Sequence, residues 1–346
     1  MFFASDNSGP AHPTVMQALA DVNTGYMPSY GADLVMQRVK ARLRDIFEAP
    51  NAEIRLVATG TAANALALAT MTQPFETVFC SPVAHIHEDE CNAPEFYMGG
   101  AKLTLVGDGD RIAPDALRRA IKAEGNRGVH GPQRGPLSIT TVTERGTVYS
   151  VAEIETLCGI AAQYGLPVHL DGARFANAME ALGCTPAEMT WKAGVDAVSF
   201  GGTKNGCMGV EAVIFFDPDK AWEFELRRKR GGHLFSKHRY LSAQMEAYLA
   251  DDLWRDLAQT ANARAAYLEK GLHSIGAGFL WPREANMIFA TLPRRAHQRL
   301  HDAGAMYHLW DGELDGPQDD ALGCRLVCDW SITEAQIDRF IEIAKG

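Results

Sequence analysis

The sequence predicts an α/β fold: a mostly parallel central sheet with helices on both faces, followed by a smaller C-terminal α+β domain. Over the first two thirds of the chain, short apolar runs alternate with longer amphipathic stretches, as strands and helices do in parallel sheets. After about residue 217, the pattern changes to long helical stretches and then to a short mixed segment. We therefore expect a large domain over 1–250 and a small one over 251–346.

Each element is predicted from its length and its apolar pattern. The strands expected in the large domain are the short apolar runs 54–58, 77–80, 103–106, 137–142, 168–170, 197–200 and 213–216. Helices are expected between them over 61–71, 114–123, 151–164 and 175–182. Long helices follow over 221–230 and 242–273, and the small domain is expected to contain a strand 286–291, a helix 296–303, a strand 324–329 and a helix 333–344.

The composition indicates a folded, acidic protein. Hydrophobic residues make up 47% of the 346 residues, which is enough for a large core and a second domain. The formal net charge of −10 repels phosphate backbones, so we expect no nucleic-acid partner. No run is long enough to span a membrane, and no signal peptide is recognisable. The seven scattered cysteines favour reduced thiols and a cytoplasmic location.

An acid and a lysine follow two neighbouring predicted strands. Asp171 ends the run 168–170, where it could simply cap the next helix. Lys204 follows the run 197–200 and lies among small residues; it could be an ordinary loop lysine, but its position suits a desolvated Schiff-base lysine. In a parallel sheet the ends of these strands meet at one edge, so both side chains could face one site.

Pyridoxal phosphate needs such a pair. A carboxylate beside its ring nitrogen keeps that nitrogen protonated, and a lysine binds its aldehyde. Its phosphate needs donors, which the turn Thr59-Gly60-Thr61 at the start of a predicted helix could offer. This turn is a weak signal alone, because it is neither a Walker loop nor a full dinucleotide fingerprint. The order of phosphate turn, acid and lysine matches fold type I of the pyridoxal-phosphate enzymes, the aspartate aminotransferase-like fold.

Over nearly its whole length, the chain resembles the low-specificity L-threonine aldolases. The segments that carry this resemblance are FASDNSG at 3–9, YG-D at 30–33, ATGTAANALAL at 58–68, AHIHEDECNAPEF at 84–96, GTVYS at 146–150, HLDGARFANA at 169–178, LGCTPAEMTWKAGVDAVSFGGTKNG at 182–206 and SKHRYLSA at 236–243. The resemblance implies cleavage of L-threonine, L-allo-threonine and related β-hydroxy-α-amino acids to glycine and an aldehyde.

The resemblance also implies roles for individual residues. Lys204 would form the internal aldimine, and Asp171 would bind the pyridine nitrogen. The residues implied to hold the phosphate are Gly60, Thr61 and Thr203, with Lys237 as a further phosphate ligand. His85 would stack on the ring.

The substrate side of the implied site draws on distant segments. The residues implied to bind the α-carboxylate are Ser5, Arg174 and Arg325, so segment 1–15 is expected at the active site. Asp89 would line the aldehyde side, and His130 would lie near the substrate hydroxyl. The general base stays open among His85, His130 and an ordered water.

Oligomeric contacts and alternative functions complete the expectations. Tyr30 and Lys237 match positions that such enzymes supply from a neighbouring subunit, which implies a homo-oligomer with a dimer as its active unit, and the family suggests a tetramer. The acids and histidines at 85–90 also resemble a metal cluster, but we expect no catalytic metal, because the cofactor already supplies an electron sink. β-Elimination, racemisation, transamination and a non-catalytic scaffold are the alternatives.

Overall fold

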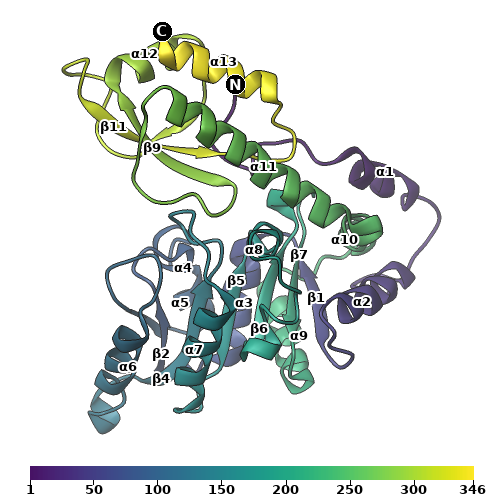
Figure 1. Cartoon of the computed structure of the whole chain (residues 1–346). Coiled ribbons are helices and arrows are strands. Elements are labelled where there is room, and N and C mark those ends of the chain that lie inside the picture. Colours follow the sequence, from purple (N-terminus) through teal and green to yellow (C-terminus); the bar gives the residue numbers. More distant parts are fainter.

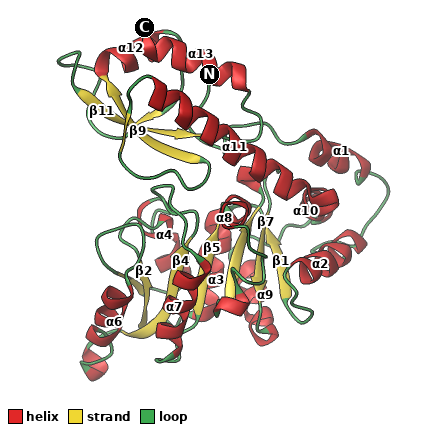
Figure 2. Ribbon diagram, in the orientation of Figure 1, coloured by secondary structure: helices red, strands yellow, loops and turns green.

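The computed structural model describes all residues 1–346, arranged as two sheets with their covering helices (Figures 1 and 2). The elements up to residue 249 are α1 (Pro13–Asp21), α2 (Leu34–Ile46), β1 (Glu53–Val57), α3 (Gly60–Met71), β2 (Glu76–Cys80), α4 (His85–Glu88), α5 (Ala93–Tyr97), β3 (Lys102–Leu105), α6 (Pro114–Ala123), β4 (Gln133–Thr140), α7 (Val151–Ala162), β5 (Val168–Gly172), α8 (Phe175–Leu182), β6 (Ala197–Gly201), β7 (Glu211–Phe215), α9 (Ala221–Arg230) and α10 (Arg239–Leu249). After them come α11 (Leu253–Ser274), β8 (Gly278–Phe279), β9 (Met287–Pro293), α12 (Arg294–Asp302), β10 (His308–Leu309), β11 (Ala321–Val327) and α13 (Glu334–Lys345).

The large sheet has seven strands in the order β1-β7-β6-β5-β4-β2-β3. Strands β2 to β6 are mutually parallel, whereas β7 runs antiparallel to both of its neighbours, β1 and β6. Strand β1 is therefore parallel to β6, and both have their carboxyl ends at the same edge. The expected mostly parallel α/β sheet is confirmed.

Helix α3 occupies the centre of the large half. Every residue from Ala62 to Met71 is buried, which fits its alanine-rich sequence because small side chains let a helix approach its neighbours closely. A helix that is apolar on all sides belongs in the interior. Its N-terminus follows directly from β1, at the carboxyl edge of the sheet.

The second sheet is small and antiparallel, with strand order β10-β11-β9-β8. Helices α11, α12 and α13 cover it in Figure 1. The chain's own N-terminus joins this half, since Phe2 bridges to Met306 and Phe3 is buried in the same hydrophobic core as Phe340. We propose the division between 1–250 and 251–346 at the junction of α10 and α11.

The helix predicted over 242–273 is wrong in one respect. The chain breaks between α10 and α11 at Asp251 and Asp252, both of which have left-handed backbone angles, with φ of 50° and 56°. Aspartate tolerates this conformation better than most residues. The break changes the direction of the chain before α11. Near the start of α11, Trp254 and Leu257 pack in the hydrophobic core of the large sheet. Later in the helix, Leu268 and Leu272 pack in the core of the small sheet.

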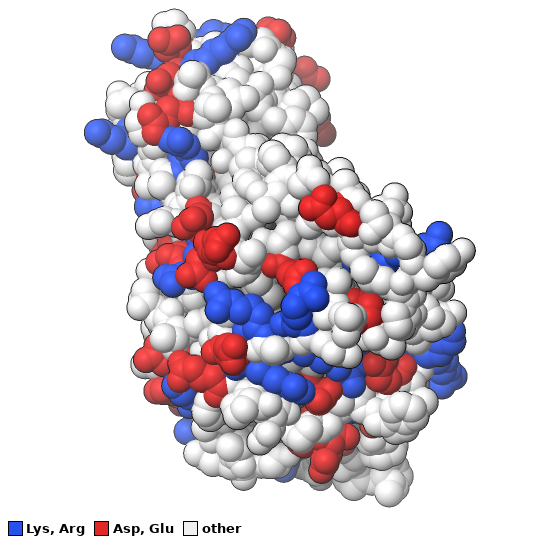
Figure 3. Space-filling view, turned by 90° about the vertical axis from the view of Figure 1, so that its right-hand side faces the viewer, with Lys and Arg blue, Asp and Glu red and all other residues white.

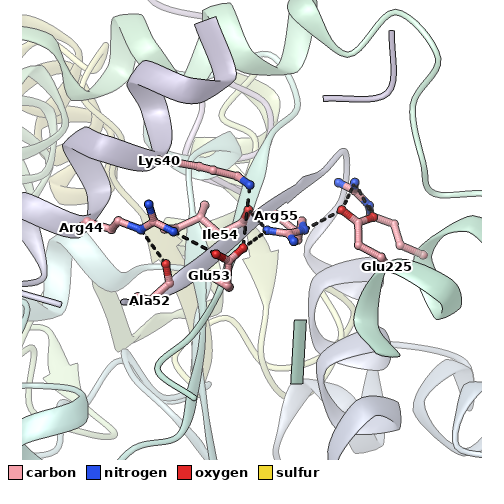
Figure 4. Close-up of polar contacts among 8 residues, drawn as sticks. Lys40, Arg44, Ala52, Glu53, Ile54, Arg55 and Glu225 are labelled. Carbon is pink, nitrogen blue, oxygen red and sulfur yellow. Dashed lines mark hydrogen bonds and ion pairs between the residues drawn. The ribbon is translucent and has the colours of Figure 1, made fainter. Parts of the chain in front are cut away.

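Charged side chains protect the edge strand β1, as Figure 4 shows. Glu53 accepts hydrogen bonds from Arg44 on α2 at 2.9 Å and from Arg55 at 2.5 Å, and Lys40 approaches the same carboxylate at 3.8 Å. Arg55 in turn pairs with Glu225 on α9. Such charges oppose edge-to-edge pairing with another chain.

On the face shown in Figure 3, Lys and Arg lie beside Asp and Glu, so charges of the two signs are interspersed. None of the helices combines the length and the apolar composition needed to cross a lipid bilayer.

Candidate active site

The register of the large sheet brings the candidate residues to one edge. Asp171 near the end of β5 pairs with Thr140 of β4 and Ser199 of β6. Val57 at the end of β1 and Gly201 at the end of β6 both pair with Glu211. Ligands of open α/β sheets bind at the carboxyl ends of strands. The turn after β1, the acid on β5 and the lysine after β6 therefore share one edge.

Asp171 is buried, and protein donors hold both of its carboxylate oxygens. Oδ2 accepts a hydrogen bond from Asn64 Nδ2 at 2.8 Å, and Oδ1 accepts one from the Ala173 N–H at 3.0 Å. Each carboxylate oxygen can accept more than one hydrogen bond. The side chain thus has a fixed direction and keeps acceptor capacity for a further N–H.

Lys204 lies in a short 3-10 turn, 203–205, that is fixed on both sides. The Gly202 N–H donates to Glu211 at 2.8 Å, and the Asn205 amide donates to Tyr248 at 2.8 Å and to the Trp254 carbonyl at 2.7 Å. The partly buried Lys204 amine forms no hydrogen bond or ion pair in the structure. A rigid turn with an unpaired amine suits a lysine that binds a ligand covalently.

Glu211 accepts the Gly202 N–H and so helps to fix this turn. This carboxyl was not identified from the sequence. Burial raises the pKa of Glu211 to about 7, although the Thr203 hydroxyl, the Gly202 N–H and the Lys204 ammonium all favour its ionised form. The folded protein therefore binds this proton more tightly than the unfolded chain does. Its contribution to stability is largest below pH 4.5 and is lost as the pH rises to about 7.

Replacing Glu211 by glutamine is expected to remove this dependence. In urea unfolding of the cofactor-free protein, the stability of wild type relative to Glu211→Gln should fall by roughly 3 kcal/mol between acidic and neutral pH. Measurements at pH 5 and pH 8 should capture most of the change. An equal difference between the two proteins at both pH values would show that Glu211 does not titrate in this way.

The N-terminus of α3 lies at the same edge. Thr59 caps the helix by accepting the Ala62 N–H at 3.2 Å, and a side chain at Gly60 would meet nothing within 4 Å. The first N–H groups of a helix have no intrahelical partner and attract anions. The Thr203 hydroxyl accepts the Val210 N–H at 3.1 Å and favours the ionised form of Glu211 through a hydrogen bond. The N–H groups of Gly60 and Thr61 therefore offer open donors to an anion.

His85 begins α4, and its ring is one third exposed. Its Nδ1 lies 2.9 Å from Glu90 Oε1. This hydrogen bond raises the pKa of His85 against the effect of burial; Asp171 and Glu144 raise it further, and Lys204 lowers it. These mutual effects identify Glu144 as another acid of the site.

Glu144 follows β4 in the segment TVTERG, and no sequence pattern pointed to it. Burial raises its pKa, and Asp171 raises it further, while the neighbouring cations oppose that shift. Its position after a buried strand, next to the strand that carries Asp171, is the signal that could have identified it.

Two arginines lie together on the substrate side. Arg174 is held by Asp6 through two hydrogen bonds, Nε–Oδ2 at 2.6 Å and Nη2–Oδ1 at 2.9 Å. Although burial alone would raise the pKa of Asp6, its pairing with Arg174 lowers that pKa. Arg325 donates from Nη2 to the Ala4 carbonyl at 3.0 Å, and its buried Nε has no partner.

This arrangement refines the expected carboxylate site. One edge of the Arg174 guanidinium is occupied by Asp6, so Nη1 is the part left for a ligand. The unpaired Arg325 Nε is a free donor beside it, and the Arg174 charge contributes, after burial, to lowering the pKa of Arg325. Segment 1–15 does reach this place, because Ala4 and Asp6 contact the two arginines. Ser5 lies between them in the chain and accepts the Asn7 N–H at 3.1 Å.

Three further predicted residues are exposed. Asp89 is exposed but lies close enough to Arg325 for its charge to oppose, in part, the lowering of the Arg325 pKa. Tyr30 and Lys237 are exposed and near each other, since the Tyr30 N–H donates to the Ser236 carbonyl at 3.2 Å. No hydrogen bond, ion pair or ring contact joins Tyr30 or Lys237 to the other predicted residues of the same chain.

The structure does not bring His130 into this site. His130 is exposed in a short turn that precedes β4, whereas Thr140, at the other end of β4, pairs with Asp171. Eight residues of β4 separate the two edges of the sheet, which is about 23 Å at the usual strand rise. Within its own chain His130 therefore lies at the edge of the sheet opposite to Asp171, and its place near the substrate hydroxyl stays a prediction.

The acidic and histidine-rich run at 85–90 is divided by the fold. His85 and Glu90 bond to each other, whereas His87, Glu88 and Asp89 are exposed. No group of three or more His, Cys, Asp or Glu side chains is placed to hold a metal ion.

The side chains present fit pyridoxal phosphate. The buried Asp171 carboxylate can accept an N–H from a pyridine ring, and the unpaired Lys204 amine can bind an aldehyde. The open N-terminus of α3 can receive a phosphate, since space remains where a side chain at Gly60 would stand. The orphaned Arg325 Nε is a donor for a substrate carboxylate.

Comparison with known proteins gives a consistent result. A family model described as "Beta-eliminating lyase" matches residues 3–294. The "Low specificity L-threonine aldolase" of Pseudomonas aeruginosa is 38% identical over 346 residues, which cover 99% of this chain and 96% of that protein. A protein of the same name from Pseudomonas sp. is 38% identical over 338 residues, covering 97% and 94%. The solved structure of a Leishmania major threonine aldolase superposes with a TM-score of 0.92 at 26% identity, covering 99% of this chain and 98% of that one.

Proposed function

The chain belongs to the β-eliminating lyase family, among the low-specificity L-threonine aldolases, and from this premise we propose its reaction and the roles of its residues. It has the type I fold of pyridoxal-phosphate enzymes and uses that cofactor. It cleaves L-threonine, L-allo-threonine and related β-hydroxy-α-amino acids to glycine and an aldehyde. The observation that carries the residue assignment is that Asp171, near the end of β5, and Lys204, shortly after the end of β6, belong to adjacent parallel strands and lie at one edge of the sheet.

The cofactor would be held at its aldehyde, its ring and its phosphate. Lys204 would bind the aldehyde, Asp171 would accept the ring N–H, and His85 would lie against the ring. Gly60, Thr61 and Thr203 would bind the phosphate. When bound, pyridoxal phosphate supplies an electron sink for the pair released from the Cα–Cβ bond. Asp171 has the rigidity this role needs, because Asn64 and the Ala173 N–H fix both of its oxygens.

The arginines would orient the substrate. Arg325, through its unpaired Nε, and Arg174, through the nitrogen that Asp6 leaves free, bind the α-carboxylate together with Ser5. Charge-assisted hydrogen bonds of this kind fix direction as well as position. Fixing the carboxylate would fix the orientation of the substrate about Cα, and so would favour the breaking of one particular bond to that carbon. Asp89 at the rim would face the departing aldehyde.

His85 is the histidine that lies in the site of its own chain, and we assign it the role of general base. Its partly exposed ring could accept the β-hydroxyl proton, which would let the Cα–Cβ bond break and the aldehyde leave. A histidine base suits neutral pH.

Product analysis tests the function. Purified protein loaded with pyridoxal phosphate should release acetaldehyde and glycine in equal amounts from L-threonine, and benzaldehyde and glycine from phenylserine. β-Elimination would give an oxo acid and ammonia, and transamination an oxo acid without ammonia. Racemisation would give the enantiomer. A protein that binds the cofactor yet releases no aldehyde from any of these substrates would refute the assignment.

A homo-oligomer is part of this proposal, with a dimer as the minimal active unit and a tetramer as the assembly. Tyr30 and Lys237 support it, since both are exposed and close together but outside the site of their own chain. Each would complete the site of a neighbouring copy, Lys237 at the phosphate. Large exposed apolar side chains lie within four residues of them in the sequence, at Tyr26, Leu34 and Phe235.

Subunit complementation tests the sharing of sites. Tyr30→Ala and Lys204→Ala should each be inactive, but refolding them together should restore roughly a quarter of the wild-type activity. The reason is that a mixed dimer contains one site with an intact Lys204 and an intact Tyr30 from the other copy. No recovery in verified mixed dimers would mean that Tyr30 acts in its own chain or not at all.

A cytoplasmic location is also proposed. All seven cysteines are free, and five of them are buried. Proteins of oxidising compartments commonly use cysteines in disulfides, whereas cytosolic thiols stay reduced.

A further inference from the structure

Glu90 is a fully buried carboxyl with no lysine or arginine as its partner. Its side chain is 0% exposed, and its hydrogen-bond partners are the Asn64 amide at 2.9 Å and His85 Nδ1 at 2.9 Å, both on Oε1. Its second oxygen, Oε2, has no partner. Burying a carboxyl without a cation is costly, so such a group calls for an explanation beyond packing.

We propose that Glu90 and Asn64 are positioning residues that hold His85 with Nδ1 as the donor and Nε2 as the free base, and that connect this base to Asp171. The expected effects on kcat rest on the proposed function. The hydrogen-bond network itself can be tested in protein without cofactor.

The hydrogen-bond pattern determines which nitrogen of His85 carries the proton. Burial and the nearby Asp171 raise the pKa of Glu90, whereas its hydrogen bonds with His85 and Asn64 lower it. In its ionised form Glu90 is only an acceptor, so His85 Nδ1 donates to it, and the lone pair of the neutral ring then lies on Nε2. A proton on Glu90 Oε2 would have no acceptor. When Nε2 receives a proton from a substrate, the new positive charge lies beside the carboxylate, which balances it. A base oriented by a third group in this way is a recurring arrangement in catalysis.

The Asn64 amide lies between the carboxyl groups of Glu90 and Asp171 and donates a hydrogen bond to each. One amide nitrogen donates to Glu90 Oε1 at 2.9 Å and to Asp171 Oδ2 at 2.8 Å. Without this donor, the two acids would face each other in a buried place, and like charges would drive protons onto one of them. Asn64 lies one turn after Gly60 on α3, so a single helix supplies the anion-binding turn and the link between Asp171 and Glu90.

The charged groups around His85 come from four parts of the chain. Glu90 follows α4, Glu144 follows β4, Asp171 ends β5 and Lys204 follows β6. The hydrogen bond to Glu90 is the largest influence that raises the pKa of His85, ahead of the two more distant acids, while burial and Lys204 lower it. Removing the Glu90 charge should therefore lower the pKa of His85 even though the other acids remain.

The test compares Glu90→Gln with a matched control, Glu88→Gln, which changes an exposed acid two residues away. In cofactor-free protein, NMR titration of the His85 ring, assigned by the signal lost in His85→Asn, should give a lower pKa in Glu90→Gln than in wild type. Glu88→Gln should titrate like wild type. In the loaded enzyme, kcat for threonine should fall about 10- to 100-fold in Glu90→Gln with little change in KM, as for other residues that orient a reacting side chain.

The pH profile distinguishes positioning from mere structural support. The acidic limb of kcat against pH should move to lower pH in Glu90→Gln, because the base keeps its free form at lower pH. Glu90→Asp retains the negative charge. In this variant the pKa of His85 measured by NMR and the acidic limb of the kcat profile should both lie closer to wild type than in Glu90→Gln. If Glu90→Gln does not fold, Glu90→Asp and Asn64→Ala are titrated instead, and both should lower the pKa of His85.

Two results would overturn the inference. One is an unchanged pKa of His85 in every folded variant at positions 90 and 64. The other is a loss of kcat without movement of the acidic limb, which would make Glu90 only a packing residue. A third outcome separates the two proposals. If the pKa of His85 shifts in the variants as expected but the loaded protein cleaves no threonine, the proposed function is refuted and the hydrogen-bond assignment stands.

Discussion

Replacing Lys204 by alanine is expected to abolish the visible absorption of the lysine-bound cofactor and to lower kcat for threonine by at least about a thousandfold. The physical reason is that no other amine is placed at this edge of the sheet with the Asp171 carboxylate opposite. The turn itself should survive, because Asn205 and Gly202 hold it through groups that the substitution leaves unchanged.

The matched control is Lys192→Ala, which removes an exposed lysine paired with Glu48 at 2.7 Å and remote from the site. Spectrum and rate should stay at wild-type values in that variant. Lys204→Ala that retains both the absorption and more than a tenth of kcat would disprove the assignment of this lysine.

Replacing Asp171 by asparagine is expected to lower kcat roughly 10²- to 10⁴-fold while the cofactor still attaches to Lys204. Asparagine keeps the size of the side chain but cannot favour a protonated ring nitrogen, so the ring becomes a poorer electron sink. The measurement is kcat at saturating cofactor, with the spectrum recorded to show that the cofactor is bound.

Asp196→Asn is a suitable control for this variant. Asp196 precedes β6 at the opposite edge of the same sheet, where its carboxylate accepts the Val168 N–H at 2.7 Å. A change there should affect stability and leave kcat near wild type. Comparable losses of kcat in the two variants, or none in Asp171→Asn, would argue against a specific role for Asp171 at the ring nitrogen.

The sequence was most informative where chemistry is tied to the ends of strands. A polar residue that comes directly after a buried run, as Asp171 does, or a few small residues later, as Lys204 does, lies at an edge of the sheet, and this is why the amino-acid pattern alone pairs the two. The periodicity of apolar residues was likewise sufficient for the mostly parallel sheet. Both inferences depend only on local pattern.

What required the structure was contact between distant segments. Asn64 looks like one more core residue in an alanine-rich helix, and nothing local indicates that its amide bridges Glu90 and Asp171. Asp6 and Arg174 are far apart in the chain, so their pairing could not be read from spacing.

The sequence also did not reveal the position of His130 relative to the sheet or the backbone break before α11. His130 was placed near the substrate by resemblance alone, and the register of β4 shows how far the end of that strand next to His130 lies from Asp171 in the same chain. The break before α11 depends on two aspartates with positive φ, in a segment whose apolar pattern otherwise continues a helix. Short polar residues of this kind occur inside helices as well as at their ends, so pattern alone did not decide.

Borohydride reduction of the cofactor-loaded protein, followed by proteolysis and mass spectrometry, tests the central claim most directly, because it records which side chain holds the cofactor aldehyde. The account predicts one phosphopyridoxyl group per chain, on Lys204, in wild type and in Asp171→Asn alike. Labelling of another lysine in the wild-type protein, or no labelling of a protein saturated with pyridoxal phosphate, would contradict it.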